Sequence, residues 1–210
     1  MMQENNPSYE FIASLLKKYN GVKVDNGCGE NEFKKKYDEE IIGLEIKDAS
    51  QADIIVDGKK LPFGNEKVDV FLSNFVLEHV EDRKLYLEEM KRCLKKEGVV
   101  ILSVPLPMWY GAYFFSPSSW LRPLREFKSF VKSPLGLFSH GHPMKHSFFY
   151  EISEWREKNY LKLFESEGLR VKERYVTCNI FSLNKRFAKV FGKVSFPDFL
   201  KVHVTFVLVK

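Results

Sequence analysis

Residues 25–29 place a carboxylate and two glycines directly after a short apolar run. Asp25 and Asn26 are followed by Gly27, Cys28 and Gly29. Glycine adopts positive φ readily and has no Cβ, so the backbone of such a turn can approach a bound molecule closely. Turns of this type after a strand often hold a nucleotide or a related molecule. An isolated GxG is also a common tight turn, so the choice depends on the rest of the chain.

Acidic side chains follow the next two apolar runs. Glu45 comes sixteen residues after Gly29, and an acid at the end of a second strand accepts hydrogen bonds from a ribose diol. Asp57 and Gly58 follow the third run and precede the motif LPF, which begins at Leu61. A carboxylate there would accept a hydrogen bond from an exocyclic amine, and apolar side chains would flank a flat base. The alternatives are a solvated strand-end acid for Glu45 and a turn cap for Asp57.

A fourth polar segment, SNFVLEHVED at residues 73–82, follows the fourth apolar run. In open α/β sheets, ligands bind outside the carboxyl ends of the strands, near the point where the strand order reverses. The four segments would therefore meet at one edge of a sheet.

The elements that must position these segments can be predicted from the spacing of apolar residues. Strand-like runs occupy 22–25, 41–46, 52–57, 68–75 and 98–105. Amphipathic helices are predicted at 8–20, 82–95 and about 153–167, the second of them ended by Gly98. Two late β-rich runs, 169–178 and 201–210, predict a hairpin that completes the sheet.

We therefore expect an α/β fold with a Rossmann-like, doubly wound and mostly parallel sheet and an antiparallel C-terminal hairpin strand. About a dozen residues separate Glu45 from Asp57, which is too few for a full crossover helix. Any second helix there is a turn or absent.

Composition indicates one globular domain. The chain has 210 residues, of which 44% are hydrophobic and 29% charged, enough for one sizeable α/β domain but not two. No uninterrupted apolar stretch is long enough to span a bilayer, and the N-terminus does not resemble a signal peptide. Three cysteines without CxxC spacing favour neither disulfides nor zinc. We expect a cytoplasmic protein, and its dispersed net charge of +5 gives no support for nucleic-acid binding.

Four stretches together resemble the class I S-adenosylmethionine-dependent methyltransferases: VDNGCGEN, ADIIVDGKKLPF, VDVFLSNFVLEHVED and MKRCLKKEGVVILSVP. The resemblance covers roughly residues 20–105, with a weaker similarity at 154–171. It is strongest to the branch that carries an LPF motif, an LEHV motif and an LKPGG-like turn. The resemblance implies a SAM-dependent methyltransferase. The expected acceptor is a small molecule, a saccharide or a lipid-linked molecule, by fold-level analogy with lids that vary with substrate.

The resemblance also implies roles for individual residues. Asp25 and the turn Gly27-Cys28-Gly29 would hold the methionine end of the cofactor. Glu45 would bind the ribose hydroxyls, and Asp57, Gly58 and Leu61 would flank the adenine. Asn74 and Phe75 would line the methyl-donor pocket, with Glu78 and His79 opening the helix behind it.

Two departures from the family pattern accompany this resemblance. Asn31 occupies a position where the family more often has a third glycine, and residues 95–98 read KKEG rather than KPGG. Asn tolerates positive φ better than most residues, although its side chain could narrow the entry of the cofactor. Neither change removes a contact that the resemblance implies.

The catalytic candidates are histidines. His79 is a candidate base, with a structural histidine at a helix start as the alternative. His140, His142 and His146 are candidates for acceptor binding or for a base, and no metal site is expected because Gly141 and Pro143 indicate a loop without companion ligands. Cys28 and Cys93 are expected to be small buried side chains.

Residues 106–150 form an aromatic and basic insertion that we interpret as a substrate lid. It contains twelve aromatic residues and five Lys or Arg against one acid, Glu126. Three interpretations remain open: a site for a bulky saccharide or lipid-linked acceptor, a contact with an anionic membrane surface, or aromatic packing over the sheet.

Two other functions were weighed. A homologue without catalytic activity that binds the cofactor and acts as a partner or regulatory subunit is the alternative to an enzyme. A nicotinamide-dependent dehydrogenase is disfavoured because the turn lacks GxGxxG spacing.

Overall fold

The computed structural model describes residues 7–37, 40–46, 51–108, 153–179 and 201–210. In these residues a seven-stranded sheet has the order β3-β2-β1-β4-β5-β7-β6. The strands are β1 (Lys23–Asn26), β2 (Ile41–Glu45), β3 (Ile54–Ile55), β4 (Val68–Asn74), β5 (Leu94–Pro105), β6 (Arg170–Asn179) and β7 (Lys201–Val209). The helices are α1 (Pro7–Leu16), α2 (Glu32–Tyr37), η1 (Leu77–His79), α3 (Arg83–Cys93) and α9 (Glu157–Ser166).

The sheet confirms the predicted fold class. Strands β1 to β5 pair in parallel, and β7 lies between β5 and β6 and is antiparallel to both. The strand order reverses at β1, which pairs with β2 on one side and with β4 on the other. The carboxyl ends of β1 and β4 therefore border the position where open α/β sheets bind their ligands.

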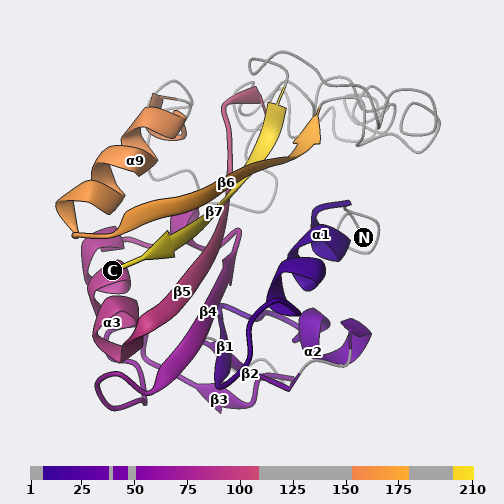
Figure 1. Ribbon diagram of the computed structural model, residues 1–210, viewed down its shortest axis with the longest axis vertical. Coiled ribbons are helices and arrows are strands. Elements are labelled where there is room, and N and C mark those ends of the chain that lie inside the picture. Colours follow the sequence, from indigo (N-terminus) through magenta and orange to yellow (C-terminus); the bar gives the residue numbers. More distant parts are fainter. Residues whose placement is uncertain (1–6, 38–39, 47–50, 109–152, 180–200) are drawn as a thin grey trace, which may run out of the picture.

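Helices cover both faces of the sheet, with α1 and α2 on one side and α3 and α9 on the other (Figure 1). Successive residues of the central strands enter opposite cores because strand side chains alternate between faces. Val70 and Leu72 of β4 pack with α1 and α2, whereas Phe71 packs with α3 and α9. Burial on both faces explains why β4 and β5 are almost continuously apolar in sequence.

The junction between α3 and β5 differs from the prediction. The helix ends at Cys93, and β5 begins at Leu94 rather than at Gly98. The β4–β5 register shifts between Val68 and Val70, so KKEG forms an irregular part of the ladder. A Cβ at Gly98 would lie 2.9 Å from the carbonyl oxygen of Asp69, so this glycine permits close backbone approach rather than stopping the helix.

The segment after β4 also differs from the prediction. Glu78 and His79 do not open the long helix but belong to η1, a single 3₁₀ turn. The long helix α3 begins later, after Asp82, whose carboxylate accepts a hydrogen bond from the backbone N–H of Leu85 at 3.0 Å. Asp82 is a typical N-cap residue, which explains why the helix starts there.

Two further elements differ from the prediction, one in its length and one in being present at all. Only Ile54 and Ile55 of the predicted strand 52–57 pair with β2. The short helix α2 was not predicted, because six residues give too little periodicity to recognise. Among the described helices, none is long and apolar enough to cross a membrane.

Candidate active site

The glycine turn after β1 brings its backbone to the end of β2. The N–H groups of Gly27 and Cys28 both donate to the carbonyl oxygen of Leu44 at 2.9 Å. Gly27 has φ +95° and Gly29 has φ +53°, so both use the conformation that favours glycine. A Cβ at Gly27 would lie 2.5 Å from Val76, whereas a Cβ at Gly29 would meet nothing within 4 Å. Gly27 thus packs against the segment after β4, and Gly29 faces open space.

Substituting each glycine should separate the cost of packing against Val76 from the cost of a strained φ. Gly27→Ala should lower the free energy of unfolding by about 2–4 kcal/mol, since its Cβ overlaps Val76 and its φ is strained. Gly29→Ala should cost only about 1–2 kcal/mol, the cost of the strained φ. Urea unfolding of the two variants measures the difference. Equal costs would contradict the packing described for Gly27.

Asn31 supports the turn from the side of β2. It adopts φ +56°, as its tolerance of this region led us to expect, and is 2% exposed. Its amide nitrogen donates to the carbonyl oxygen of Gln51 at 2.9 Å and to Asp53 at 3.3 Å. The side chain is thus held against β2 and the segment that precedes β3.

Asp53 organises this corner of the sheet, although sequence reasoning did not select it. Its carboxylate accepts hydrogen bonds from the backbone N–H of Gly43 at 2.8 Å and from Lys34 at 2.6 Å. These contacts lower the pKa of Asp53, against the effect of its burial. Asp53 therefore joins α2, β2 and the glycine turn.

Asp53→Ala should lower the free energy of unfolding by about 1–3 kcal/mol, because the buried N–H of Gly43 loses its acceptor. Lys34→Ala is the control and should cost at most about 1 kcal/mol, since that ion pair is half exposed. Chemical denaturation of both variants gives the comparison. A larger loss in the lysine variant would contradict this assignment.

Glu45 ends β2 beside the glycine turn. Its carboxylate accepts hydrogen bonds from the backbone N–H groups of Gly29 at 2.9 Å and of Ile46 at 2.8 Å. An ionised carboxylate has about four acceptor positions, so capacity remains for a ligand hydroxyl. The structure thus places Glu45 and the turn in direct contact.

Asp25 is the most buried acid of this region, at 2% exposed. Burial, together with the charge of Glu45, raises its pKa to about 7. Its Oδ1 atom has no hydrogen-bond partner among the described residues. A buried carboxyl oxygen of this kind is costly unless a ligand satisfies it.

Tyr86 of α3 links the end of β1 to β4. Its hydroxyl donates to the carbonyl oxygen of Asn26 at 2.9 Å and lies 2.9 Å from the hydroxyl of Ser73. Burial raises the pKa of Tyr86, and the charges of Asp25 and Glu78 add to the effect. The Tyr86 hydroxyl thus lies in a region surrounded by acids from separate elements.

Tyr9 of α1 enters the same region from the opposite layer, which sequence reasoning missed. Its ring stacks on Phe33 with centroids 4.9 Å apart, and its hydroxyl oxygen accepts a hydrogen bond from the side-chain amide of Asn74. Burial, followed by the charges of Glu32 and Asp25, raises the pKa of Tyr9 to about 12. No motif marked Tyr9, which is one aromatic residue of an amphipathic helix.

Phe75 follows Asn74 with a strained backbone. It has φ +57°, which is rare for an aromatic residue and is associated with functional sites. Its N–H donates to the carbonyl oxygen of Ser103 at 3.0 Å, and its ring contacts that of His203 with centroids 4.5 Å apart. His203 lies on β7 and is buried, which lowers its pKa to about 3, so its imidazole is neutral at pH 7.

Asp57 and Gly58 lie at the exposed end of β3. The Asp57 carboxylate accepts hydrogen bonds from the backbone N–H groups of Lys59 and Lys60 at 2.9 and 3.1 Å, so it does cap the following turn. These two bonds hold its pKa below the ordinary value. Gly58 approaches Ile46, to which a Cβ would come within 3.2 Å. Ile46 is an apolar side chain, 61% exposed, beside Glu45, and it was not selected from the sequence.

The LPF segment is held to α3 by two charged residues. Glu89 accepts a hydrogen bond from the N–H of Leu61 at 2.9 Å and pairs with Arg92. Arg92 donates in turn to the carbonyl oxygens of Leu61 and Phe63. Leu61 is 8% exposed and belongs to the hydrophobic core, so most of its side chain packs inside the protein.

Glu78 and His79 differ sharply in exposure. The side chain of Glu78 is 3% exposed and that of His79 is 41% exposed, with His79 Nε2 lying 3.8 Å from Glu78 Oε1. Cys28 and Cys93 are buried free thiols, as expected. The candidate histidines His140, His142 and His146 lie outside the described residues.

Four buried polar atoms without a hydrogen-bond partner among the described residues come from the ends of β1 and β4 and from the turn that follows β4. They are Asp25 Oδ1, Asn26 Nδ2, Asn74 Oδ1 and Glu78 Oε2. Native proteins rarely leave such atoms unsatisfied. Because β1 and β4 border the point where the strand order reverses, these atoms indicate a site for a polar ligand there.

Comparison with known proteins shows similarity to methyltransferases. Residues 24–102 match the family model described as a methyltransferase domain. A curated protein of Methanocaldococcus jannaschii, itself uncharacterized, is 35% identical over 111 residues, which are 48% of this chain and 54% of that protein. The chain thus spans about half the length of this relative.

Solved structures extend the similarity to almost the whole chain. An S-adenosylmethionine-dependent methyltransferase from Mesorhizobium loti has a TM-score of 0.60 at 13% identity, covering 97% of this chain and 98% of its own. The fold is that of the SAM-dependent methyltransferases. A second methyltransferase-fold neighbour, from Haloferax volcanii, was solved in complex with the Trm112 methyltransferase activator; its TM-score is 0.62 at 16% identity, with 99% and 91% of the two chains covered.

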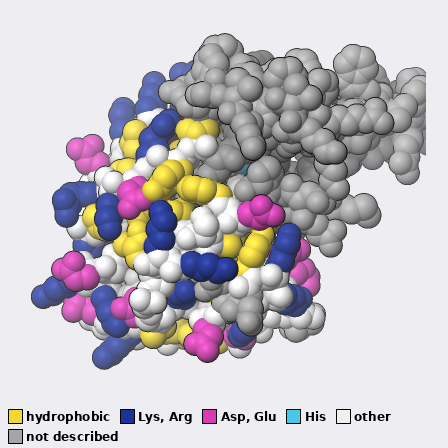
Figure 2. Space-filling model, turned by 45° about the vertical axis from the view of Figure 1, so that its right-hand side comes forward, with side chains coloured by type: hydrophobic (Ala, Val, Ile, Leu, Met, Phe, Trp, Pro, Cys, Tyr) yellow, Lys and Arg dark blue, Asp and Glu magenta, His cyan; other side chains and the backbone are white. Residues whose placement is uncertain are grey.

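S-adenosylmethionine is the cofactor that this family match and fold imply, and the site fits it. The unsatisfied oxygens of Asp25 and Asn74 suit its ammonium group and other donors, and Gly29 offers its open side. On the face in Figure 2, basic and acidic side chains are interspersed over the described part of the methyltransferase fold.

Proposed function

We propose that this chain is a SAM-dependent methyltransferase that transfers a methyl group to a small-molecule, saccharide or lipid-linked acceptor. One observation carries the proposal: the unsatisfied buried polar atoms gather at the strand-order reversal, beside the glycine turn. The family match over residues 24–102 supports it. The LPF and LEHV motifs favour the branch of the family that carries them.

The proposed cofactor site follows from the geometry. Asp25 and the turn Gly27-Cys28-Gly29 hold the methionine end, because Asp25 Oδ1 is buried without a hydrogen-bond partner among the described residues and a Cβ at Gly29 would meet nothing within 4 Å. Glu45 binds the ribose hydroxyls while the N–H groups of Gly29 and Ile46 keep it in place.

At the adenine end, Gly58 and Ile46 form the exposed apolar surface, and Asp57 and Leu61 border it. Asp57 retains acceptor capacity beyond its two backbone contacts. At the methyl end, Asn74 and Phe75 line the pocket, and Tyr9 covers Asn74 from α1.

Methyl transfer requires mainly that the protein align the methyl donor with the acceptor. The bound cofactor supplies an activated methyl group on a sulfonium, whose departing sulfur needs no proton. The protein contributes by holding donor and acceptor in line, and by removing a proton where the acceptor carries one. The strained backbone at Phe75 fixes the ring at the methyl end.

We also propose that residues 1–210 form a single domain in which 106–150 acts as the substrate lid. Its aromatic and basic composition, twelve aromatic residues and one acid, supports an acceptor-covering role. His140, His142 and His146 are proposed acceptor-site residues in this lid, and His79 is a proposed base. Binding of the protein to anionic vesicles would extend the role of the lid to a membrane surface.

The test is methyl transfer from tritiated SAM to fractionated cell extract. Incorporation into a small-molecule or lipid fraction is expected, and it should be lost in Asp25→Ala, which lacks the buried carboxylate. Cofactor binding without transfer to any fraction would contradict catalysis and favour a regulatory cofactor-binding subunit.

A requirement for a partner is the second candidate. It is favoured by the Haloferax volcanii neighbour, which was solved with an activator protein. If such a partner is needed, purified protein alone should bind SAM weakly, and addition of cell extract should restore both binding and transfer.

A further inference from the structure

Glu78 is a buried acid that the proposed cofactor contacts do not use. It lies on η1, in the turn that follows the methyl-end residues Asn74 and Phe75. Its side chain is 3% exposed, and its Oε2 atom has no hydrogen-bond partner among the described residues. An acid in this state needs either a proton or a ligand that donates a hydrogen bond.

Glu78 is close enough to the Tyr86 hydroxyl, which joins the ends of β1 and β4, for its charge to affect that hydroxyl. Its charge raises the pKa of the Tyr86 hydroxyl, as do those of Asp25 and Glu45. On the other side, Arg83 of α3 lowers the pKa of Glu78, while His79 lies 3.8 Å from its Oε1. Burial outweighs Arg83 and raises the pKa of Glu78 to about 8.

We propose that buried Glu78, rather than its more exposed neighbour His79, is the acceptor-side base of this enzyme, and that the acceptor is a hydroxyl or an amine rather than a carboxylate. This inference rests on the proposed methyltransferase function. Once the cofactor's sulfonium favours its ionised form, Glu78 is a third negative charge near Asp25 and Glu45 and repels an anionic acceptor. A carboxylate acceptor also has no proton for Oε2 to take. A hydroxyl or a neutral amine donates the hydrogen bond that Oε2 lacks.

The step balances without any other reactant. A lone pair of the acceptor oxygen or nitrogen forms the new bond to the methyl carbon, while the carbon–sulfur bond breaks and its electron pair stays on sulfur. The acceptor proton passes to Glu78 Oε2. The products are the methylated acceptor, the neutral thioether and a protonated Glu78, which releases its proton to solvent when the products leave.

The first test needs no acceptor. Protein labelled with ¹³C at the Glu carboxyl carbons is followed by NMR as the pH is varied, once loaded with SAM and once with its demethylated product. The resonance of Glu78 is assigned by its absence in Glu78→Gln. The sulfonium differs from the thioether by one positive charge. The midpoint of Glu78 should therefore be at least about one pH unit lower with SAM. Equal midpoints would overturn the proposal.

The second test classifies the methylated product. Methyl esters of carboxylates are cleaved by mild base, whereas methyl ethers and methylamines are not. The tritiated product formed from cell extract should be stable to base, and a base-labile product would overturn the acceptor class. Glu78→Gln should lower the transfer rate about 100-fold or more while leaving the Kd for SAM within about threefold, the range expected of a residue that does not hold the cofactor.

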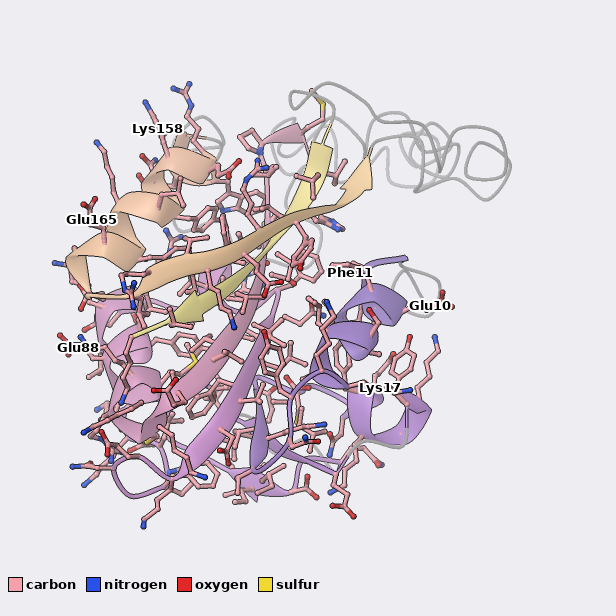
Figure 3. The ribbon with its side chains drawn as sticks, in the orientation of Figure 1. Glu10, Phe11, Lys17, Glu88, Lys158 and Glu165 are labelled. Carbon is pink, nitrogen blue, oxygen red and sulfur yellow. The ribbon has the colours of Figure 1, made fainter. Side chains whose placement is uncertain are left out.

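Glu88→Gln is the matched control. Glu88 is an exposed acid of α3 that lies at the outer side of the helix, away from the sheet (Figure 3). The control should keep wild-type transfer and affinity. Failure of the wild-type protein to bind SAM would count against the proposed function itself, whereas normal binding with unchanged transfer in Glu78→Gln would count against Glu78 alone.

Discussion

Asp25→Asn is expected to stabilise the folded protein at pH 8 while it weakens cofactor binding. The gain in the free energy of unfolding should be about 2–4 kcal/mol, since each pKa unit corresponds to about 1.4 kcal/mol. The affinity for SAM should fall about 100-fold, the scale for losing a charged hydrogen-bond partner. Effects of opposite sign from one substitution are typical of a residue kept for function rather than for folding.

The sign of the stability change follows from the raised pKa of Asp25. Its folded value is about 7, against an ordinary value of 3.8. Between these values the folded state holds a proton that the unfolded state has lost, so stability falls as pH rises. Asn cannot ionise, and the variant should lose this pH dependence. At pH 3, where both states bind the proton, wild type and variant should be nearly equal in stability.

Asp69→Asn provides a control with the opposite sign. The Asp69 carboxylate accepts hydrogen bonds from Lys95 and from the N–H of Val22, both at 2.8 Å, and its pKa is lowered. Its contribution to stability is present at neutral pH and is lost as pH falls. The Asn variant should thus be destabilised at pH 8. Thermal unfolding across pH 3–8 compares the variants, and a destabilised Asp25→Asn at pH 8 would refute the description of Asp25.

Glu45→Ala should raise the Kd for SAM about 5–150-fold, which corresponds to about 1–3 kcal/mol. The carboxylate is the proposed acceptor for the ribose hydroxyls, and it also holds the N–H groups of Gly29 and Ile46. Removing it therefore loses a direct contact and loosens the glycine turn. Isothermal titration with SAM and with its demethylated product measures the effect.

Two comparisons separate these contributions. Glu45→Gln keeps an oxygen for one backbone N–H, so its loss of affinity should lie between those of wild type and Glu45→Ala. Glu88→Ala changes an exposed acid elsewhere and should leave the Kd unchanged. An unchanged Kd in Glu45→Ala would remove Glu45 from the site.

The sequence was sufficient to predict the class of sheet and to place the candidate site residues at the carboxyl ends of its strands. Strands β4 and β5 are buried on both faces, so their apolar runs are long and unambiguous. Because parallel strands end at one edge, Asp25, Glu45 and Asn74 were expected to lie near one another, and Asp25 and Glu45 do interact. Asn31 has a positive φ, which agrees with its interpretation as a mild substitution for a glycine.

The residues that the sequence did not reveal make contacts with residues far away along the chain. Tyr9 reaches Asn74 from α1, and Tyr86 joins the ends of β1 and β4 from α3. Asp53 and Arg92 fix the loops around the site through backbone contacts. Each is an ordinary residue of its own segment, and its role exists only once the sheet brings those segments together.

The decisive measurement is isothermal titration of the purified chain with SAM and, separately, with its demethylated product. The account predicts one site with micromolar affinity for both ligands, and weaker binding in Asp25→Asn and Glu45→Ala. Absence of binding to wild-type protein, with cell extract present as well as absent, would contradict the assignment of the strand-end site to this cofactor.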